Sequence, residues 1–416
     1  MGRLPFPGDA SALDVRAAET VAPGRAAAVT RVKPAYVAGF VALVMTAIVS
    51  RGRATPYDNY VLLAQAFLHG HAWIDWPGAY IDALGYGGAH YVIEAPLPAI
   101  LLLPYVALAG IAANQTLLAI VLAAVAIGAA WELGERFGLQ AEGNAWICAF
   151  LLAGTDLLWC AMLGDVWFLA HVSAVCFTLL ALVELAGKRR AWLVALFAAC
   201  AFESRFTLVL ALPAYAYLCF TEPEKPFAIA PSWRRALTGF AAVLLPVAVL
   251  WLLYNRARWG TWTDIGYTTW YHQDEAGFPT GSPFRLAYLP EQLWSFFVRA
   301  PTRLGEFPYL RPEFTGVALT WTSPALVLAF LARGPARWAV ALWGATILTA
   351  VPNVLYYVNG FAQFGMRHAL DFEPFLVALM MLAVRKRFPA WGYVVIAYSI
   401  AAGLWGCWYW NSFVRA

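Results

Sequence analysis

Four short stretches of this 416-residue chain place ionisable side chains directly beside apolar runs. In the first, Asp58 follows an apolar run and stands at the head of the amphipathic stretch NYVLLAQAFLHGHAWID. A carboxylate held there could serve as a general base that removes the proton of a hydroxyl group. The alternative is an acid at a helix N-terminus, where the helix dipole favours negative charge.

The second stretch centres on Asp165, which is followed six residues later by His171. Asp156 lies inside the apolar run that precedes it. An acid within an apolar run is costly, so it is a candidate functional group by default. The alternative is a set of hydrogen-bonded side chains at helix ends.

The third stretch is Glu203-Ser204-Arg205, which separates two apolar runs. An arginine in this position needs an anionic partner. Glu203 is one candidate partner for Arg205. A lipid phosphate is the other, because the planar guanidinium fork matches the oxygen atoms of a phosphate group.

The fourth stretch, residues 359–375, reads NGFAQFGMRHALDFEPF and carries Gln363, Arg367 and Asp371. Arg367 and Asp371 are four residues apart, so they could form an ordinary ion pair on one helix face. They could equally line a pocket for a phosphate and a sugar.

The composition restricts the class of protein that can use these groups. The chain is 62% hydrophobic and only 12% charged, whereas soluble domains average about 25% charged residues. These values predict an all-α protein that crosses the membrane many times, and exclude a soluble enzyme or a nucleic-acid binder. The six cysteines lie in apolar runs without CxxC spacing, which indicates buried thiols.

Apolar length predicts about eleven membrane-spanning helices, since a span needs about 20 apolar residues. The predicted spans are residues 35–50, 114–133, 144–161, 166–187, 191–203, 206–220, 236–254, 316–332, 336–352, 370–384 and 391–408. The pair 191–203 and 206–220 could be a hairpin that does not cross fully. Residues 95–112 are apolar but contain three prolines, so we expect a helix along the outer membrane surface.

The basic residues orient these spans. They cluster at 188–190, at 225 with 234–235, at 333 with 337, and at 385–387. The positive-inside rule places these clusters and the N-terminus in the cytoplasm and the C-terminus outside. We therefore predict a disordered cytoplasmic tail at 1–33 and a membrane domain at 34–416. Residues 51–113 and 255–315 become long outer segments, and all six histidines fall on the outer side.

In the order of its motifs the chain resembles the GT-C superfamily of multispanning glycosyltransferases, especially bacterial relatives of protein mannosyltransferases and of the lipid A aminoarabinose transferase. The matching features are the acid after the first span, the APLPAILLLPYVAL surface helix, the GDVWFLAHV turn, the ESRFTLVLALP hairpin and the late FAQFGMRHALDFEPFL segment. The likeness runs through most of residues 35–385.

This resemblance implies an inner-membrane enzyme that moves a sugar from a polyprenyl-phosphate donor to a periplasmic hydroxyl of a glycan, lipid or protein. It implies that Asp58 is the catalytic acid and general base, with surface helices in the first periplasmic loop. Many members carry a second acid beside this position, whereas this chain has Asn59, which weakens the case for a metal at the pair.

Further roles follow from the chemistry that this reaction needs. Arg205 and Arg367 would bind the donor phosphate and stabilise its developing charge. The residues expected to contact the substrate or the acceptor are Glu94, Asp165, His171, Gln363 and Asp371. The sequence leaves the use of a divalent cation open, because it does not show that oxygen ligands converge.

Two other classes of function compete with an enzyme. A transporter or flippase of lipid-linked saccharides would need a polar route across the whole bilayer. A membrane scaffold would need neither an arginine at a hairpin tip nor an aspartate within a span. The charges cluster at the outer ends of the predicted spans, which favours an enzyme pocket that faces outward.

Overall fold

The computed structural model describes residues 32–225, 227–273 and 281–415, and nearly all of its regular structure is helical. The predicted tail at 1–33 lies almost entirely outside the described residues. Residues 34–416 belong to one compact unit.

Several helices are long and apolar enough to cross a membrane. They are α4 (Gln115–Phe137), α7 (Val166–Ala186), α10 (Trp233–Trp259), α14 (Ala336–Leu355), and α16 (Ala390–Tyr409) with its π-helical extension η6 (Trp410–Val414). Helices α5 (Ala141–Ala153) and α6 (Leu157–Leu163) are bent by 49° and together form a sixth candidate span. Five or six candidate spans in the described residues make this a multi-pass membrane protein.

The remaining predicted spans are helical but shorter. They are α1 (Pro34–Ser50), α8 (Ala191–Phe202), η2 (Phe206–Ala211) with α9 (Leu212–Phe220), α13 (Leu319–Thr322) with η4 (Pro324–Leu331), and η5 (Arg367–Asp371) with α15 (Glu373–Val384). A 12-residue helix is about 18 Å long, against about 30 Å of hydrocarbon. Pro213, Pro324 and Pro374 each stand in the first turn of a new helix, so they divide runs that look continuous in sequence.

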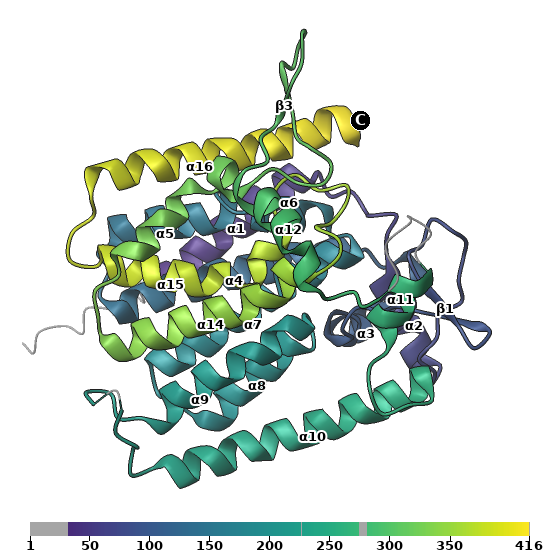
Figure 1. Ribbon diagram of the computed structural model, residues 1–416, viewed down its shortest axis with the longest axis horizontal. Helices are drawn as coiled ribbons and strands as arrows, with labels where there is room; N and C mark the ends of the chain where they lie inside the picture. Colours follow the sequence, from purple (N-terminus) through teal and green to yellow (C-terminus); the bar gives the residue numbers. More distant parts are fainter. Residues whose placement is uncertain (1–31, 226, 274–280, 416) are drawn as a thin grey trace, which may run out of the picture. The chain divides into compact units, whose positions relative to one another are not determined.

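The expected surface helix is α3 (Leu97–Ala109), which continues into η1 (Gly110–Ala112) and contains Pro104. It packs against α2 (Asn59–Leu68). These helices lie at the same end of the bundle as the antiparallel hairpin of β1 (Leu84–Tyr86) and β2 (Ala89–Tyr91), and as α11 (Gly266–Gln273) (Figure 1). We call this the site end.

Most of the second predicted outer segment is ordered in short elements. These are α11, η3 (Leu286–Tyr288), α12 (Leu289–Phe297), and the two-stranded pair of β3 (Thr302–Arg303) and β4 (Leu310–Arg311). Residues 274–280 of this segment lie outside the described part of the chain.

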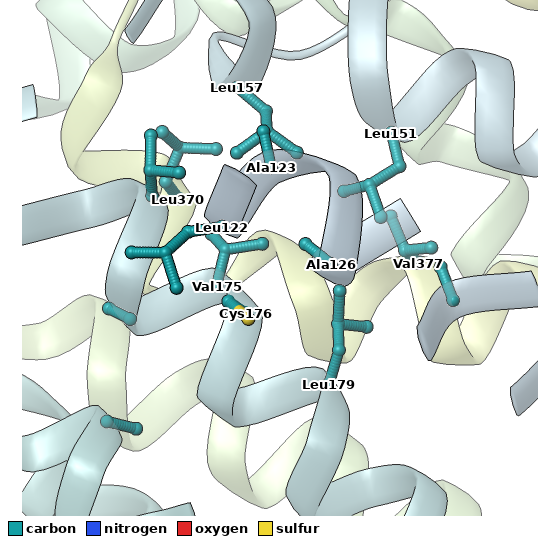
Figure 2. Close-up of a cluster of buried hydrophobic side chains, with 14 of the residues drawn as sticks. Leu122, Ala123, Ala126, Leu151, Leu157, Val175, Cys176, Leu179, Leu370 and Val377 are labelled. Carbon is teal, nitrogen blue, oxygen red and sulfur yellow. The ribbon is translucent and has the colours of Figure 1, made fainter. Parts of the chain in front are cut away.

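The core is built around α4 and α7. Leucine, valine and alanine side chains from α4, α5, α6, α7, η5 and α15 meet there (Figure 2). Helices α10 and α16 lie on opposite sides of the helices between them (Figure 1), and α10 is largely exposed, as expected for a helix that faces lipid. Helices α1 and α4 cross closely, since a Cβ at Gly39 would lie 3.0 Å from the Ala124 carbonyl oxygen.

Candidate active site

Two cavities share part of their walls at the site end. One has a volume of about 680 Å³ and is lined mainly by apolar side chains of α8, η2, α10 and α14. The other, of about 710 Å³, is lined by many polar and charged side chains. Arg205, Tyr267, Tyr356 and His368 line both cavities. The guanidinium group of Arg205 therefore stands where an apolar compartment adjoins a polar one.

Arg205 is held by Asp371, not by its sequence neighbour Glu203. Its Nε donates to Oδ1 of Asp371 at 3.1 Å, and its Nη2 donates to Oδ2 at 3.0 Å. The side chain of Arg205 is 14% exposed and that of Asp371 is 0% exposed. The protein thus supplies an acid to Arg205 from a distant segment instead of Glu203, and the lipid phosphate as a further partner of Arg205 stays a prediction.

Asp371 also accepts hydrogen bonds from three other side chains. The donors are His171 Nδ1 at 3.1 Å, Thr207 Oγ1 at 2.7 Å and Asn353 Nδ2 at 3.1 Å. Asp371 does not line either cavity. It anchors Arg205 and His171, and its expected contact with substrate stays a prediction. The helix pair with Arg367 does not form.

Arg367 is buried and lines the polar cavity, with 7% exposure. Its Nη1 donates to the Phe361 carbonyl oxygen at 3.3 Å, and its guanidinium lies over the Phe168 ring at 5.2 Å. Among the described residues, no carboxylate lies within ion-pair distance of it, and its Nε has no hydrogen-bond partner.

The loops that carry Asp58 and Asp165 are joined. The Thr55 hydroxyl donates to Oδ1 of Asp165, and the Val166 amide donates to the Tyr57 carbonyl oxygen at 3.1 Å. Asp165 lines the polar cavity, and burial raises the pKa of its carboxyl to about 6. The fold therefore brings the first two sequence motifs together.

Asp58 itself stands just before α2 and is half-buried. Its carbonyl oxygen accepts the amides of Val61 and Leu62, at 2.8 and 3.2 Å. Burial raises the pKa of its carboxyl above the ordinary value. Its neighbour Tyr57 lines the polar cavity, but Asp58 is not among the lining residues.

Glu94 lines the polar cavity and is only 5% exposed. Burial raises the pKa of its carboxyl to about 8, and the nearby Asp82 acts in the same direction. Oε2 of Glu94 has no hydrogen-bond partner among the described residues. The segment before it is fixed by Arg258, whose Nη1 donates to the Val92 carbonyl oxygen at 3.3 Å.

Two other predicted residues lie behind the cavity wall. Gln363 is fully buried, and its amide nitrogen donates to the carbonyl oxygens of Thr315 at 2.8 Å and Asn359 at 2.6 Å. It thus fixes the loop that lines the cavity, although it does not line the cavity itself. Asp156 is buried against Gly365, and neither of its oxygens has a hydrogen-bond partner among the described residues.

Several lining residues were not predicted from the sequence. They include Asp82, Glu291, Arg299, Tyr267 and Tyr356, together with His368, which appeared in a motif without a role. His368 lines both cavities, and its Nδ1 lies 3.4 Å from Nη2 of Arg205. Tyrosines are common in membrane proteins, and only the contact between α11 and the end of α14 singles out Tyr267 and Tyr356.

The carboxyl groups that line the polar cavity do not converge on one point in the described part of the chain. Within the described residues, no group of three or more His, Cys, Asp or Glu side chains could hold a metal ion. Glu94 also shares its cavity with the guanidinium groups of Arg205, Arg299 and Arg367.

No family model matches the chain, and no curated protein matches it. The chain is similar to a solved structure of ArnT from Cupriavidus metallidurans, bound to undecaprenyl phosphate. The two are 16% identical, the TM-score is 0.49, and the match covers 86% of this chain. It covers 61% of that chain, so this protein spans about three-fifths of the length of its structural neighbour.

Proposed function

We propose that this protein is a membrane glycosyltransferase that moves a sugar from a polyprenyl-phosphate donor to a hydroxyl group. One observation carries the proposal: an apolar cavity and a polar cavity share a wall at Arg205. A lipid-linked sugar has the same division, with an apolar tail and a polar sugar on either side of an anionic phosphate. The sequence resemblance to GT-C enzymes supports the same reaction.

The tail of the donor would occupy the apolar cavity. Its walls include Ala198, Phe202, Leu244 and Trp251. Because α10 forms one wall and is otherwise exposed, a lipid in the bilayer would have a short path into this cavity. The phosphate would then lie beside Arg205, with the sugar in the polar compartment.

The phosphate would meet two guanidinium groups of different kinds. The charge of Arg205 is balanced by Asp371, whereas Arg367 has no carboxylate within ion-pair distance in the described structure. An anionic donor would supply the missing negative charge. Both groups would stabilise the charge that develops on the phosphate as its bond to the sugar breaks.

The proton of the acceptor hydroxyl needs a base near the sugar. The sequence resemblance implies Asp58, which lies next to the lining residue Tyr57. The carboxyl groups that line the cavity are Asp82, Glu94, Asp165 and Glu291. We further propose that the site end faces the periplasm, with about eleven helical segments in an inner membrane, α3 along its outer surface, and the acceptor a glycan, a lipid or a protein.

The direct test is sugar transfer by the purified protein in proteoliposomes, with polyprenyl-phosphate hexoses and pentoses as donors. A matched pair of variants on α10 tests the apolar cavity. Ala248 lines it, whereas Leu250 is 65% exposed and does not. Ala248→Trp should lower transfer at least tenfold, and Leu250→Trp should leave it unchanged.

The same vesicles separate an enzyme from a flippase. If the labelled donor crosses the bilayer without losing its sugar to any acceptor, the protein is a transporter of lipid-linked saccharides. Equal effects of the two tryptophan substitutions would show that the donor tail does not occupy the apolar cavity.

A further inference from the structure

We propose that His171, oriented by Asp371, is the catalytic residue that removes the proton of the acceptor hydroxyl. This inference rests on the proposed function and assigns its proton-transfer step. It differs from the role implied by the sequence resemblance, which places the base at Asp58.

The two ring nitrogens of His171 have different environments. Nδ1 lies 3.1 Å from Oδ1 of Asp371, which can only accept a hydrogen bond when it is a carboxylate. This contact places the proton of a neutral imidazole on Nδ1 and leaves a lone pair on Nε2. A carboxylate that fixes a histidine in this way is the arrangement of catalytic Asp–His pairs.

Nε2 is the unsatisfied atom. His171 is 1% exposed and lines the polar cavity, and its Nε2 has no hydrogen-bond partner among the described residues. A buried polar atom without a partner lowers the stability of the folded protein. A hydroxyl group of a bound acceptor would satisfy it.

Asp371 couples this nitrogen to the phosphate site. The same carboxylate that accepts from His171 also accepts from both Nε and Nη2 of Arg205. The base and the phosphate ligand are therefore held at a fixed separation by one buried group. The other charged or titratable groups that line this cavity include Arg367, His368, Glu94 and Asp165.

The step balances without a cofactor. The hydroxyl proton moves to Nε2 of His171, and the acceptor oxygen forms a bond to the anomeric carbon. The bond from that carbon to the phosphate oxygen breaks, and its electron pair leaves with the polyprenyl phosphate. The imidazolium then returns its proton to this phosphate, which carries one more negative charge than it did in the donor.

The test compares His171→Ala, His171→Asn and His272→Ala in the full-length protein. His272 is exposed on α11 and does not line the cavity, so its variant is the control. Loss of a general base typically lowers the rate about 10²–10⁴-fold. Both His171 variants should show this loss while they still bind polyprenyl phosphate, and added imidazole should restore His171→Ala at least tenfold.

His171→Asn separates catalysis from structure, because its amide can still donate to Asp371 but cannot take a proton. If His171→Asn keeps turnover within about threefold of the parent, His171 is only structural and the inference is overturned. If both the parent protein and His171→Ala transfer sugar normally, the inference about His171 is overturned and the proposed function stands. Parent protein that neither transfers sugar nor binds polyprenyl phosphate would overturn both.

Discussion

Arg205 and Asp371 are separated by 166 positions in sequence and meet in a buried, two-pronged salt bridge of 3.0 and 3.1 Å. The arginine comes from the break between α8 and η2, and the aspartate ends η5. This contact joins two motifs that the sequence presents separately. It also leaves Arg205 on the wall of both cavities, where its remaining donors can serve a ligand.

We expect Arg205→Lys to fold but to bind donor at least tenfold more weakly. Lysine keeps the charge, yet it cannot hold Asp371 with two parallel bonds and also present a donor to phosphate. Hydrogen bonds to charged groups contribute about 1.5–3 kcal/mol, which corresponds to about 10–100-fold in affinity. Binding of polyprenyl phosphate would be measured for Arg205→Lys and for the control Arg256→Lys, whose side chain is exposed on α10. Equal binding by both variants would contradict a phosphate role for Arg205.

Arg367→Met should separate stability from function. The guanidinium is buried without a carboxylate in ion-pair distance, so an apolar side chain of similar length should leave the unfolding temperature unchanged or raise it. The free energy of unfolding would rise by up to about 3 kcal/mol. Donor binding and turnover should both fall, because the charge would act on the phosphate before and during the reaction. A less stable variant with normal donor binding would show that Arg367 is structural.

Asp58→Asn distinguishes the two assignments of the base. Asp58 is not on the cavity wall, whereas His171 is, so we expect Asp58→Asn to retain turnover within about tenfold. If Asp58 is the base, its loss should lower turnover by about 10²–10⁴-fold at saturating donor while binding persists. Single-turnover rates of this variant and of His171→Asn, measured side by side, decide between them.

Glu94 should make donor binding depend on pH. The pKa of its carboxyl is raised from 4.5 to about 8 by burial, so the group is largely neutral at pH 7 and becomes negative as the pH rises through about 8. The new negative charge would oppose an anionic phosphate in the same cavity. Donor affinity should therefore fall above pH 8, and Glu94→Gln should remove this fall. A fall of the same size in the variant would mean that another group titrates.

The predicted orientation can be checked at two basic positions. Cysteines placed at Lys188 and Lys386 should react with a membrane-impermeant reagent only from the cytoplasmic side, because the positive-inside rule retains these clusters there. A cysteine in place of Tyr80, exposed near the hairpin, should react from the opposite side. If either basic position is labelled from the periplasmic side, the proposal that the site end faces the periplasm is wrong.

The sequence by itself was enough to establish the class of protein. A composition with few charges cannot cover a water-soluble surface, and apolar length locates the helices with little help from tertiary contacts. Their boundaries were harder to predict, because the prolines at 213, 324 and 374 begin new helices within apolar runs. The sequence also indicated candidate site residues, since ionisable groups beside apolar runs are rare. These are Arg205, Arg367, Glu94, Asp165 and His171.

Only the tertiary structure determined which of these side chains contact one another and which of them line the cavity. Helix spacing allowed Asp371 to pair with Arg367, but helix packing places it against Arg205 and His171. Gln363 supports a loop, and Asp58 lies beside the cavity wall instead of on it. Contacts between residues more than a hundred positions apart leave no local pattern, because they arise where whole helices meet. The cavity exists only after that packing, and so does the environment of His171, which lines the cavity and has an unpartnered Nε2 among the described residues.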